Sequence, residues 1–160
     1  MNETNLDITP VVAVSACLLG TPCRYDGAAR PNAAVQELRK RHEIVPVCPE
    51  SMGGLPIPRL PNEIAVGADG TRVIDSAGVD NTAAFVAGAQ AALERARRAG
   101  CAAAVLKSKS PSCGSGRIYD GTFSGMRTDG WGVAAALFRD AGIPVVDEDH
   151  LEDLPDMLHA

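Results

Sequence analysis

Short apolar runs that alternate with helix-forming segments constrain the fold of this chain more than any other feature. Four runs are brief, apolar and rich in residues that favour buried strands: 11–16, 43–47, 101–106 and 143–146. Helices are predicted between and after them, over 32–42, 81–99, 131–141 and a short last segment near the C-terminus. Because strands that alternate with helices favour a parallel sheet, we expect an α/β fold, Rossmann-like, with a mainly parallel sheet between helices.

Smaller features interrupt this alternation. Two Asp-Gly pairs, each a strong turn signal between β-rich flanks, predict small hairpin insertions over residues 64–74 and 117–127. The Pro- and Gly-rich segment 49–61 is predicted as a structured loop that contains no helix or strand. Since no linker or internal repeat divides the chain, we expect one α/β domain over residues 11–160, preceded by a flexible N-terminal tail over residues 1–10.

Charge and cysteine content narrow the class of function. A formal net charge of −5 opposes the binding of extended nucleic acid, which needs a positive surface. No apolar run approaches the roughly 18 residues that indicate a membrane span, and the polar start lacks the pattern of a signal peptide. We therefore expect a cytoplasmic protein without a membrane partner, as a monomer or small homo-oligomer. In that compartment its five cysteines are more naturally ligands, reactive thiols or core residues than disulfides.

Three cysteines lie where strands of the predicted sheet end. Cys17 and Cys48 directly follow the first two strands, and Cys113 lies seven residues beyond the third. Parallel strands present their carboxyl ends at one edge of the sheet, which is where ligands bind in open α/β folds. Nearby glycines permit tight turns that aim backbone N–H groups at sulfur. We expect the three thiols to share one metal or iron–sulfur site, and Cys101, at the start of an apolar strand, to fill the core.

Three cysteine ligands leave open what the site holds. A structural zinc site normally has four protein ligands, whereas a catalytic metal keeps one position free, and a cubane cluster on three thiolates also leaves one iron open. All-sulfur ligation suits zinc and iron–sulfur groups about equally. One alternative function is a non-catalytic binding module that zinc or a cluster stabilises, with or without Cys23 as a further ligand. Another is a thiol-redox enzyme that uses Cys17 and Cys23, which is disfavoured because these two cysteines do not form a CxxC pair.

Three motifs together carry a resemblance to a known family. They are VSACLLGTPCRYDG (14–27), VCPESMGGLPIPR (47–59) and LKSKSPSCGSG (106–116), in this order. They closely resemble the DUF523 family, and the resemblance extends over almost the whole chain. Some members of that family are thiouracil desulfidases. The resemblance implies a non-redox hydrolysis that removes sulfur from a small thiolated base, a pyrimidine such as thiouracil, and yields uracil and sulfide.

The resemblance also implies roles for individual residues. It implies a [4Fe-4S] cluster on Cys17, Cys48 and Cys113, with the substrate sulfur at the open iron, and it implies catalytic roles for Glu50 and Ser110. The chemistry agrees, because a soft thiocarbonyl sulfur suits an open iron and a carboxylate near the cluster can activate water or shuttle a proton. Without the family, a loop-capping role for Glu50 and a turn role for Ser110 are also natural. Six further residues are candidates for ring recognition or cluster support: Arg24, Tyr25, Asp26, Arg59, Lys107 and Ser112.

Overall fold

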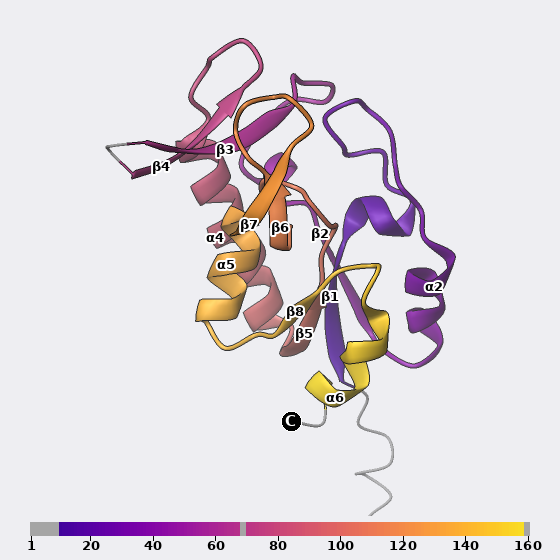
Figure 1. The fold of residues 1–160 in the computed structure, drawn as a ribbon. Coiled ribbons are helices and arrows are strands. Elements are labelled where there is room, and N and C mark those ends of the chain that lie inside the picture. Colours follow the sequence, from indigo (N-terminus) through magenta and orange to yellow (C-terminus); the bar gives the residue numbers. More distant parts are fainter. Residues whose placement is uncertain (1–9, 68–69, 159–160) are drawn as a thin grey trace, which may run out of the picture.

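A four-stranded parallel sheet forms the centre of the structure, a computed structural model that describes residues 10–67 and 70–158 (Figure 1). The strand order is β2-β1-β5-β8, and every neighbouring pair is parallel. The strands are β1 (Val11–Ser15), β2 (Ile44–Val47), β5 (Cys101–Val105) and β8 (Val145–Val146). The predicted α/β fold with a mainly parallel sheet is confirmed. The predicted tail over residues 1–10 lies, except for Pro10, outside the described residues.

Helices cover both faces of this sheet. The α-helices are α2 (Ala33–Gln36), α3 (Pro49–Met52), α4 (Thr82–Arg98), α5 (Val133–Asp140) and α6 (Leu154–Leu158), and the 3₁₀ turns are η1 (Ala16–Leu19), η2 (Glu37–Lys40) and η3 (Leu151–Asp153). Figure 1 shows α4 and α5 on one side of the sheet and α2 and α6 on the other. Because side chains alternate along a strand, Val12 and Val14 pack on the side of α2 and α6, while Ala13 packs on the side of α4 and α5. No helix in the described ranges is both long and apolar enough to cross a membrane.

Two antiparallel hairpins lie beyond the carboxyl ends of the central strands, in the upper part of Figure 1. Their strands are β3 (Asn62–Gly67), β4 (Gly70–Asp75), β6 (Ser115–Tyr119) and β7 (Arg127–Trp131). Both hairpins were predicted, although residues 68–69 of the first turn lie outside the described residues. The hairpins are tied together because Glu63 Oε1 accepts hydrogen bonds from the backbone N–H groups of Gly121 (3.0 Å) and Phe123 (3.1 Å).

Several local predictions were wrong in extent, and the last strand, predicted over 143–146, is only β8 (Val145–Val146). The helix predicted over 32–42 is α-helical only to Gln36 and continues as the 3₁₀ turn η2 to Lys40; Val35 in α2 and Leu38 in η2, three residues apart, are both buried in the same core cluster. The segment predicted as a loop over 49–61 contains the short helix α3, because Pro49 occupies the first helical position, which suits its fixed φ. Trp131, predicted to begin a helix, instead pairs with β6 as the end of β7.

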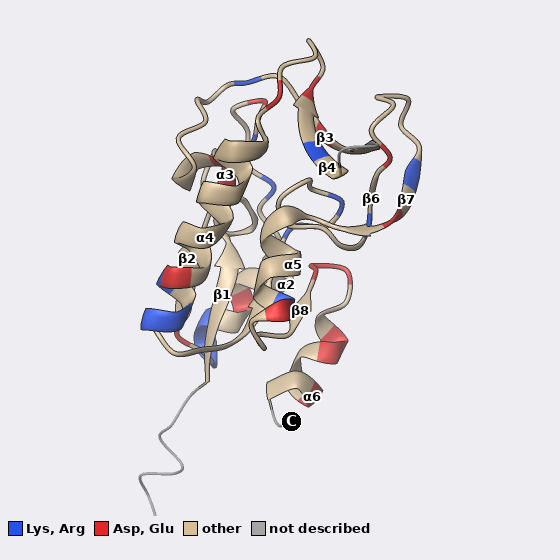
Figure 2. Ribbon diagram, turned by 90° about the vertical axis from the view of Figure 1, so that its left-hand side faces the viewer, with Lys and Arg blue, Asp and Glu red and all other residues tan. Residues whose placement is uncertain are grey.

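Helix α3 packs against α4 (Figure 2), and two glycines set this contact. A Cβ atom at Gly53 would lie 2.1 Å from the carbonyl oxygen of Ala84, and one at Gly88 would lie 1.8 Å from the carbonyl oxygen of Pro49. Neither position therefore has room for a side chain, and the two helix backbones meet directly. Since α3 follows Cys48 and carries Glu50, this contact fixes a wall of the site described below.

The order of the strands also determines where a ligand site can form. β2 lies on one side of β1 and β5 lies on the other. The order in which the chain adds strands to the sheet therefore reverses at β1. Such a switch point opens a crevice at the carboxyl ends of the strands. The segments that follow β1, β2 and β5 all leave the sheet at this edge.

Candidate metal centre

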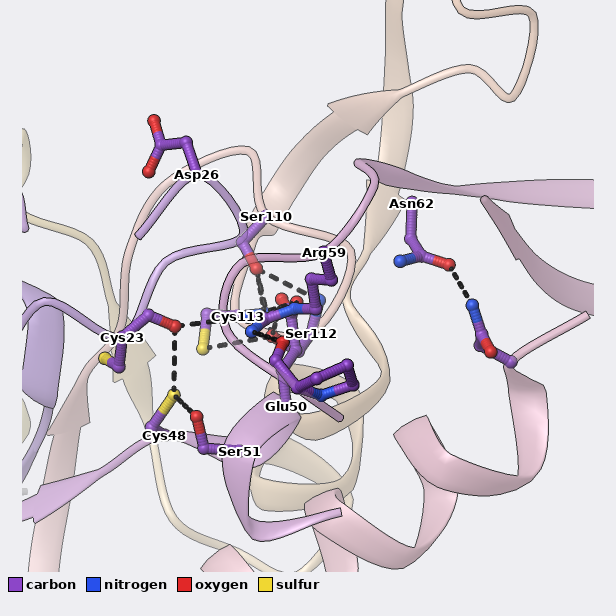
Figure 3. Close-up of polar contacts among 12 residues, drawn as sticks. Cys23, Asp26, Cys48, Glu50, Ser51, Arg59, Asn62, Ser110, Ser112 and Cys113 are labelled. Atoms are coloured by element: carbon purple, nitrogen blue, oxygen red, sulfur yellow. Dashed lines mark hydrogen bonds and ion pairs between the residues drawn. The ribbon is translucent and has the colours of Figure 1, made fainter. Parts of the chain in front are cut away.

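One cavity of about 370 Å³ lies at this switch point. The segments that follow β1, β2 and β5 form its floor, and the segments around residues 23–25 and 59–63 form much of its wall. The structure brings all the principal site residues predicted from the sequence to this cavity, together with the fourth nearby cysteine: Cys17, Cys48, Cys113, Glu50, Ser110 and Cys23. Figure 3 shows most of these side chains with their polar contacts.

The six candidates for ring recognition or cluster support differ in whether they line the cavity. Five of the six line the cavity: Arg24, Tyr25, Arg59, Lys107 and Ser112. Asp26 does not, because its Oδ1 accepts a hydrogen bond from the backbone N–H of Ala28 (3.0 Å) within its own loop. Cys101 is also remote from the cavity. It is partly buried against the core beneath α4 and α5, as the sequence predicted.

The cavity cysteines differ in how readily they ionise. Burial raises the pKa of Cys17 to about 11, although the positive charge of Lys107 opposes this effect. Burial likewise raises the pKa of Cys113 to about 12. A hydrogen bond with Cys23 lowers the pKa of Cys48 to about 6, and the same contact raises the pKa of Cys23. Metal binding displaces thiol protons, so a cationic group in the cavity is what would ionise Cys17 and Cys113.

The thiols that line the cavity suit an iron–sulfur cluster. All five cysteines are free. Across residues 10–67 and 70–158, no three Cys, His, Asp or Glu side chains lie close enough together to surround one metal ion. Cysteine thiolates that hold a cluster bind separate irons, so they need to share a cavity rather than touch one ion. Soft, free thiols from three segments of the chain line this one cavity and meet that need.

Glu50 is held in a fixed orientation beside these thiols (Figure 3). Arg59 Nη2 lies 2.8 Å from Glu50 Oε1, and Arg59 Nε donates to the same oxygen at 3.0 Å. Ser112 Oγ donates to the other oxygen, Oε2, at 3.1 Å. Arg59 is itself anchored, because it also donates to the carbonyl oxygens of Pro56 (3.0 Å) and Cys23 (3.2 Å). The carboxylate therefore has one oxygen on a buried cation and the other turned toward the segment that carries Cys113.

Ser110 has both a structural contact and a place in the cavity. Its Oγ accepts hydrogen bonds from the backbone N–H groups of Ser112 and Cys113, each at 3.1 Å, and so it shapes the turn that presents Cys113. The same oxygen lies 3.0 Å from Ser112 Oγ. The turn role and the cavity position, which were separate interpretations of the sequence, are both present in the geometry.

Two polar residues that the sequence analysis did not single out support the site. Ser15, buried at the end of β1, accepts a hydrogen bond from the backbone N–H of Lys107 (2.8 Å). Glu148 follows β8, lies 2.9 Å from Lys107 Nζ, and accepts a hydrogen bond from the backbone N–H of Ser108 (2.8 Å). Both lie where a strand of the sheet ends. Ligands bind at the carboxyl ends of the strands in open α/β folds, so the rule that indicated Cys17 and Cys48 could also have indicated these two residues.

The buried ion pair makes a prediction about stability. Arg59→Met is expected to lower the free energy of unfolding by roughly 3–5 kcal/mol, because it leaves a mostly buried carboxylate without its partner; the Arg59 and Glu50 side chains are 6% and 14% exposed. Urea unfolding of the metal-free protein measures this. The control is Arg72→Met, which removes an ion pair whose arginine is 49% exposed and is expected to cost much less. Equal costs for the two variants would contradict a special role for Arg59.

Comparisons with known proteins agree with this geometry. Residues 12–150 match the family model described as 2-thiouracil desulfurase. The chain is 40% identical over 150 residues to the uncharacterized protein YbbK of Bacillus subtilis (strain 168), and the match covers 90% of this chain and 99% of YbbK. A solved structure of the [4Fe-4S]-dependent thiouracil desulfidase TudS (DUF523) is 42% identical with a TM-score of 0.84, over 94% of this chain and 98% of that chain. The resemblance predicted from the three motifs is confirmed.

Proposed function

Because this chain belongs to the 2-thiouracil desulfurase family, we propose that it is a [4Fe-4S]-dependent desulfidase acting on a thiolated pyrimidine such as thiouracil. The observation that carries the proposal is the convergence of Cys17, Cys48 and Cys113 on one cavity that Glu50 and Ser110 also line. The reaction balances as a hydrolysis: the oxygen of water replaces sulfur on the ring carbon, and sulfur leaves as hydrogen sulfide without exchange of electrons. The described cofactor and activity of TudS support this proposal.

In this proposal, Cys17, Cys48 and Cys113 hold the cluster. When bound, the cluster supplies an open iron, a Lewis acid that suits the soft sulfur of the substrate and makes the attached ring carbon a better electrophile. The protein also places one cation, the ammonium group of Lys107, beside this site. Lys107 lies near enough to Cys17 for its charge to lower the pKa of that thiol, and Glu148 fixes its ammonium group at 2.9 Å. The ammonium group opposes the negative charge of the thiolates, although the carboxylate of Glu148 acts in the opposite direction on Cys17.

Glu50 is the base in this proposal. Arg59 holds its Oε1, so that Oε2 faces Ser112 and the cavity. A carboxylate fixed in this way can take a proton from water as the water attacks the ring carbon, and can return a proton to the departing sulfur. Ser110, fixed by the backbone of the Cys113 turn, orients the attacking water or the edge of the base.

The proposed setting follows from the thiols and the size of the site. Five free cysteines persist most readily in a reducing compartment, so we place the protein in the cytoplasm. A cavity of about 370 Å³ that also holds a cofactor leaves space for a small base rather than for an extended polymer. A monomer or a small homo-oligomer meets the needs of such a site, because the described chain supplies all of the residues assigned here.

Anaerobic reconstitution tests the proposal. The metal-free protein is loaded with iron and sulfide, and sulfide release is then measured with 2-thiouracil and 4-thiouracil. The iron-loaded protein is expected to be brown and to release sulfide together with uracil, whereas zinc-loaded and metal-free samples are expected to release none. A fully iron-loaded protein that is inactive on both compounds would instead support a non-catalytic module stabilised by a cluster.

A further inference from the structure

We propose that Ser112 is a positioning residue that joins the Ser110 hydroxyl to the Glu50 carboxylate and passes a proton between them. This inference rests on the proposed desulfidase function. It adds a relay to a pair of residues that are otherwise unconnected: within the described ranges no direct hydrogen bond joins Ser110 to Glu50.

The contacts of Ser112 carry the inference. The residue is only 2% exposed, and it lies in the wall of the cavity between the turn of Cys113 and helix α3. Its Oγ lies 3.1 Å from Glu50 Oε2 on one side and 3.0 Å from Ser110 Oγ on the other (Figure 3). A third neighbour, Cys113 Sγ, is farther away at 3.5 Å. The buried Ser112 hydroxyl therefore connects Ser110 to Glu50, which lies on a different segment of the chain.

The number of hydrogens fixes the direction of this link. A serine hydroxyl has one hydrogen to donate. An ionised carboxylate only accepts, and hydrogen bonds to charged acceptors are the stronger ones, so the Ser112 hydrogen is directed to Glu50 rather than to the sulfur of Cys113. Ser112 Oγ is then the acceptor for Ser110. Ser110 Oγ already accepts two backbone N–H groups, which leaves its own hydrogen for Ser112. The chain of donors runs from Ser110 through Ser112 to Glu50.

Both ends of this chain are fixed. At one end, Arg59 binds Glu50 Oε1 through Nε and Nη2, so Oε2 remains turned toward Ser112. At the other end, the backbone of the Cys113 turn holds Ser110 Oγ. The donor order Ser110, Ser112, Glu50 is therefore set before the reaction begins, and one backbone hydrogen bond to Ser110 Oγ gives way when this oxygen accepts a proton.

The relay balances with the proposed hydrolysis. The oxygen of water bonds to the ring carbon, and one water proton passes to Ser110 Oγ, which releases one of its two backbone N–H donors, as the Ser110 proton moves to Ser112 and the Ser112 proton moves to Glu50. Each hydroxyl again carries one hydrogen, now directed back along the chain, and Glu50 holds one proton. As the carbon–sulfur bond breaks and the carbon–oxygen double bond forms, sulfur takes this proton and the second proton of the water. Hydrogen sulfide leaves, and no electrons are exchanged.

The test compares two serine variants that each lose a hydroxyl beside a ligand cysteine. Ser112→Ala removes the relay. Ser51→Ala is the matched control, because Ser51 Oγ lies 3.3 Å from Cys48 Sγ but, within the described residues, makes no side-chain hydrogen bond to Ser110 or Glu50. Both proteins are reconstituted anaerobically, and iron per chain, urea unfolding, KM and kcat are measured. The solvent isotope effect on kcat is recorded in mixtures of H₂O and D₂O.

Ser112→Ala is expected to load iron and bind substrate like the parent protein while its kcat falls about 10²-fold. Its isotope effect should become linear in the deuterium fraction, whereas the parent and Ser51→Ala should show the curvature of several moving protons. The relay is overturned if Ser112→Ala keeps its kcat, if its loss of kcat only follows a loss of iron, or if the curvature persists. A fully loaded parent that releases no sulfide overturns the proposed function, and the relay with it.

Discussion

Replacement of Cys17, Cys48 or Cys113 by Ala is expected to abolish iron–sulfur binding and sulfide release. Each of these thiols comes from a different segment at the switch point of the sheet, so none can take the place of another. A cluster held by three thiolates has no spare protein ligand. Loss of one thiolate therefore exposes a second iron to water and allows the cluster to dissociate. Iron and sulfide per chain after anaerobic reconstitution measure the effect directly, independently of any substrate.

Cys101→Ala is the matched control for these variants. It also removes one thiol, but from a partly buried position against the core, away from the cavity. It is expected to load iron like the parent protein. Full iron loading in a Cys48→Ala protein would remove Cys48 from the ligand set. Cys23→Ala extends the test, because retention of iron in that variant assigns Cys23 to the wall of the cavity rather than to the cluster.

Glu50→Gln is expected to leave the cluster intact and to lower turnover by about 10²–10⁴-fold. The amide has nearly the size of the carboxylate, and its oxygen can still accept from Arg59, so the fold of helix α3 should persist. It cannot take a proton at neutral pH, which is the function proposed for Glu50. Initial rates of sulfide release, divided by the iron content of each sample, give the effect on chemistry alone.

The control for Glu50→Gln is Glu94→Gln, which changes an exposed carboxylate on α4 that pairs with Arg98 on the same helix. This variant should match the parent protein in iron content and rate. Near-normal turnover in a well-loaded Glu50→Gln sample would show that Glu50 has a purely structural role in its loop. The proton would then have to come from another group or from water.

The sequence was sufficient to predict the parallel sheet and the edge of it at which the thiols lie. Apolar runs of strand length followed by helical segments have few stable arrangements other than a parallel sheet, and that sheet directs Cys17 and Cys48 to one edge. It was not sufficient for α3. A helix of four residues is too short to show a helical period, and its position depends on contacts of Gly53 and Gly88 with backbone that is remote in sequence.

The hydrogen bonds and the ion pair between the side chains of the site could likewise not be predicted from the sequence. The motifs indicated Glu50, Arg59 and Ser112 separately, but the pairing of Glu50 with Arg59 depends on the path of the loop between them. The contact between Glu50 and Ser112 joins segments 62 residues apart. Hydrogen-bond partners across such distances follow from the packing of loops, which residue type and periodicity do not encode.

Hydrolytic desulfidation at the three-cysteine cavity is tested most directly by the origin of the oxygen in the product. The fully loaded protein is supplied with 4-thiouracil in water enriched in oxygen-18, under argon and without an electron donor, and the uracil is analysed by mass spectrometry beside the released sulfide. The expected result is one labelled oxygen and one sulfide for each uracil formed. Unlabelled uracil, a requirement for a reductant, or no sulfide from a fully loaded protein would contradict the proposed reaction.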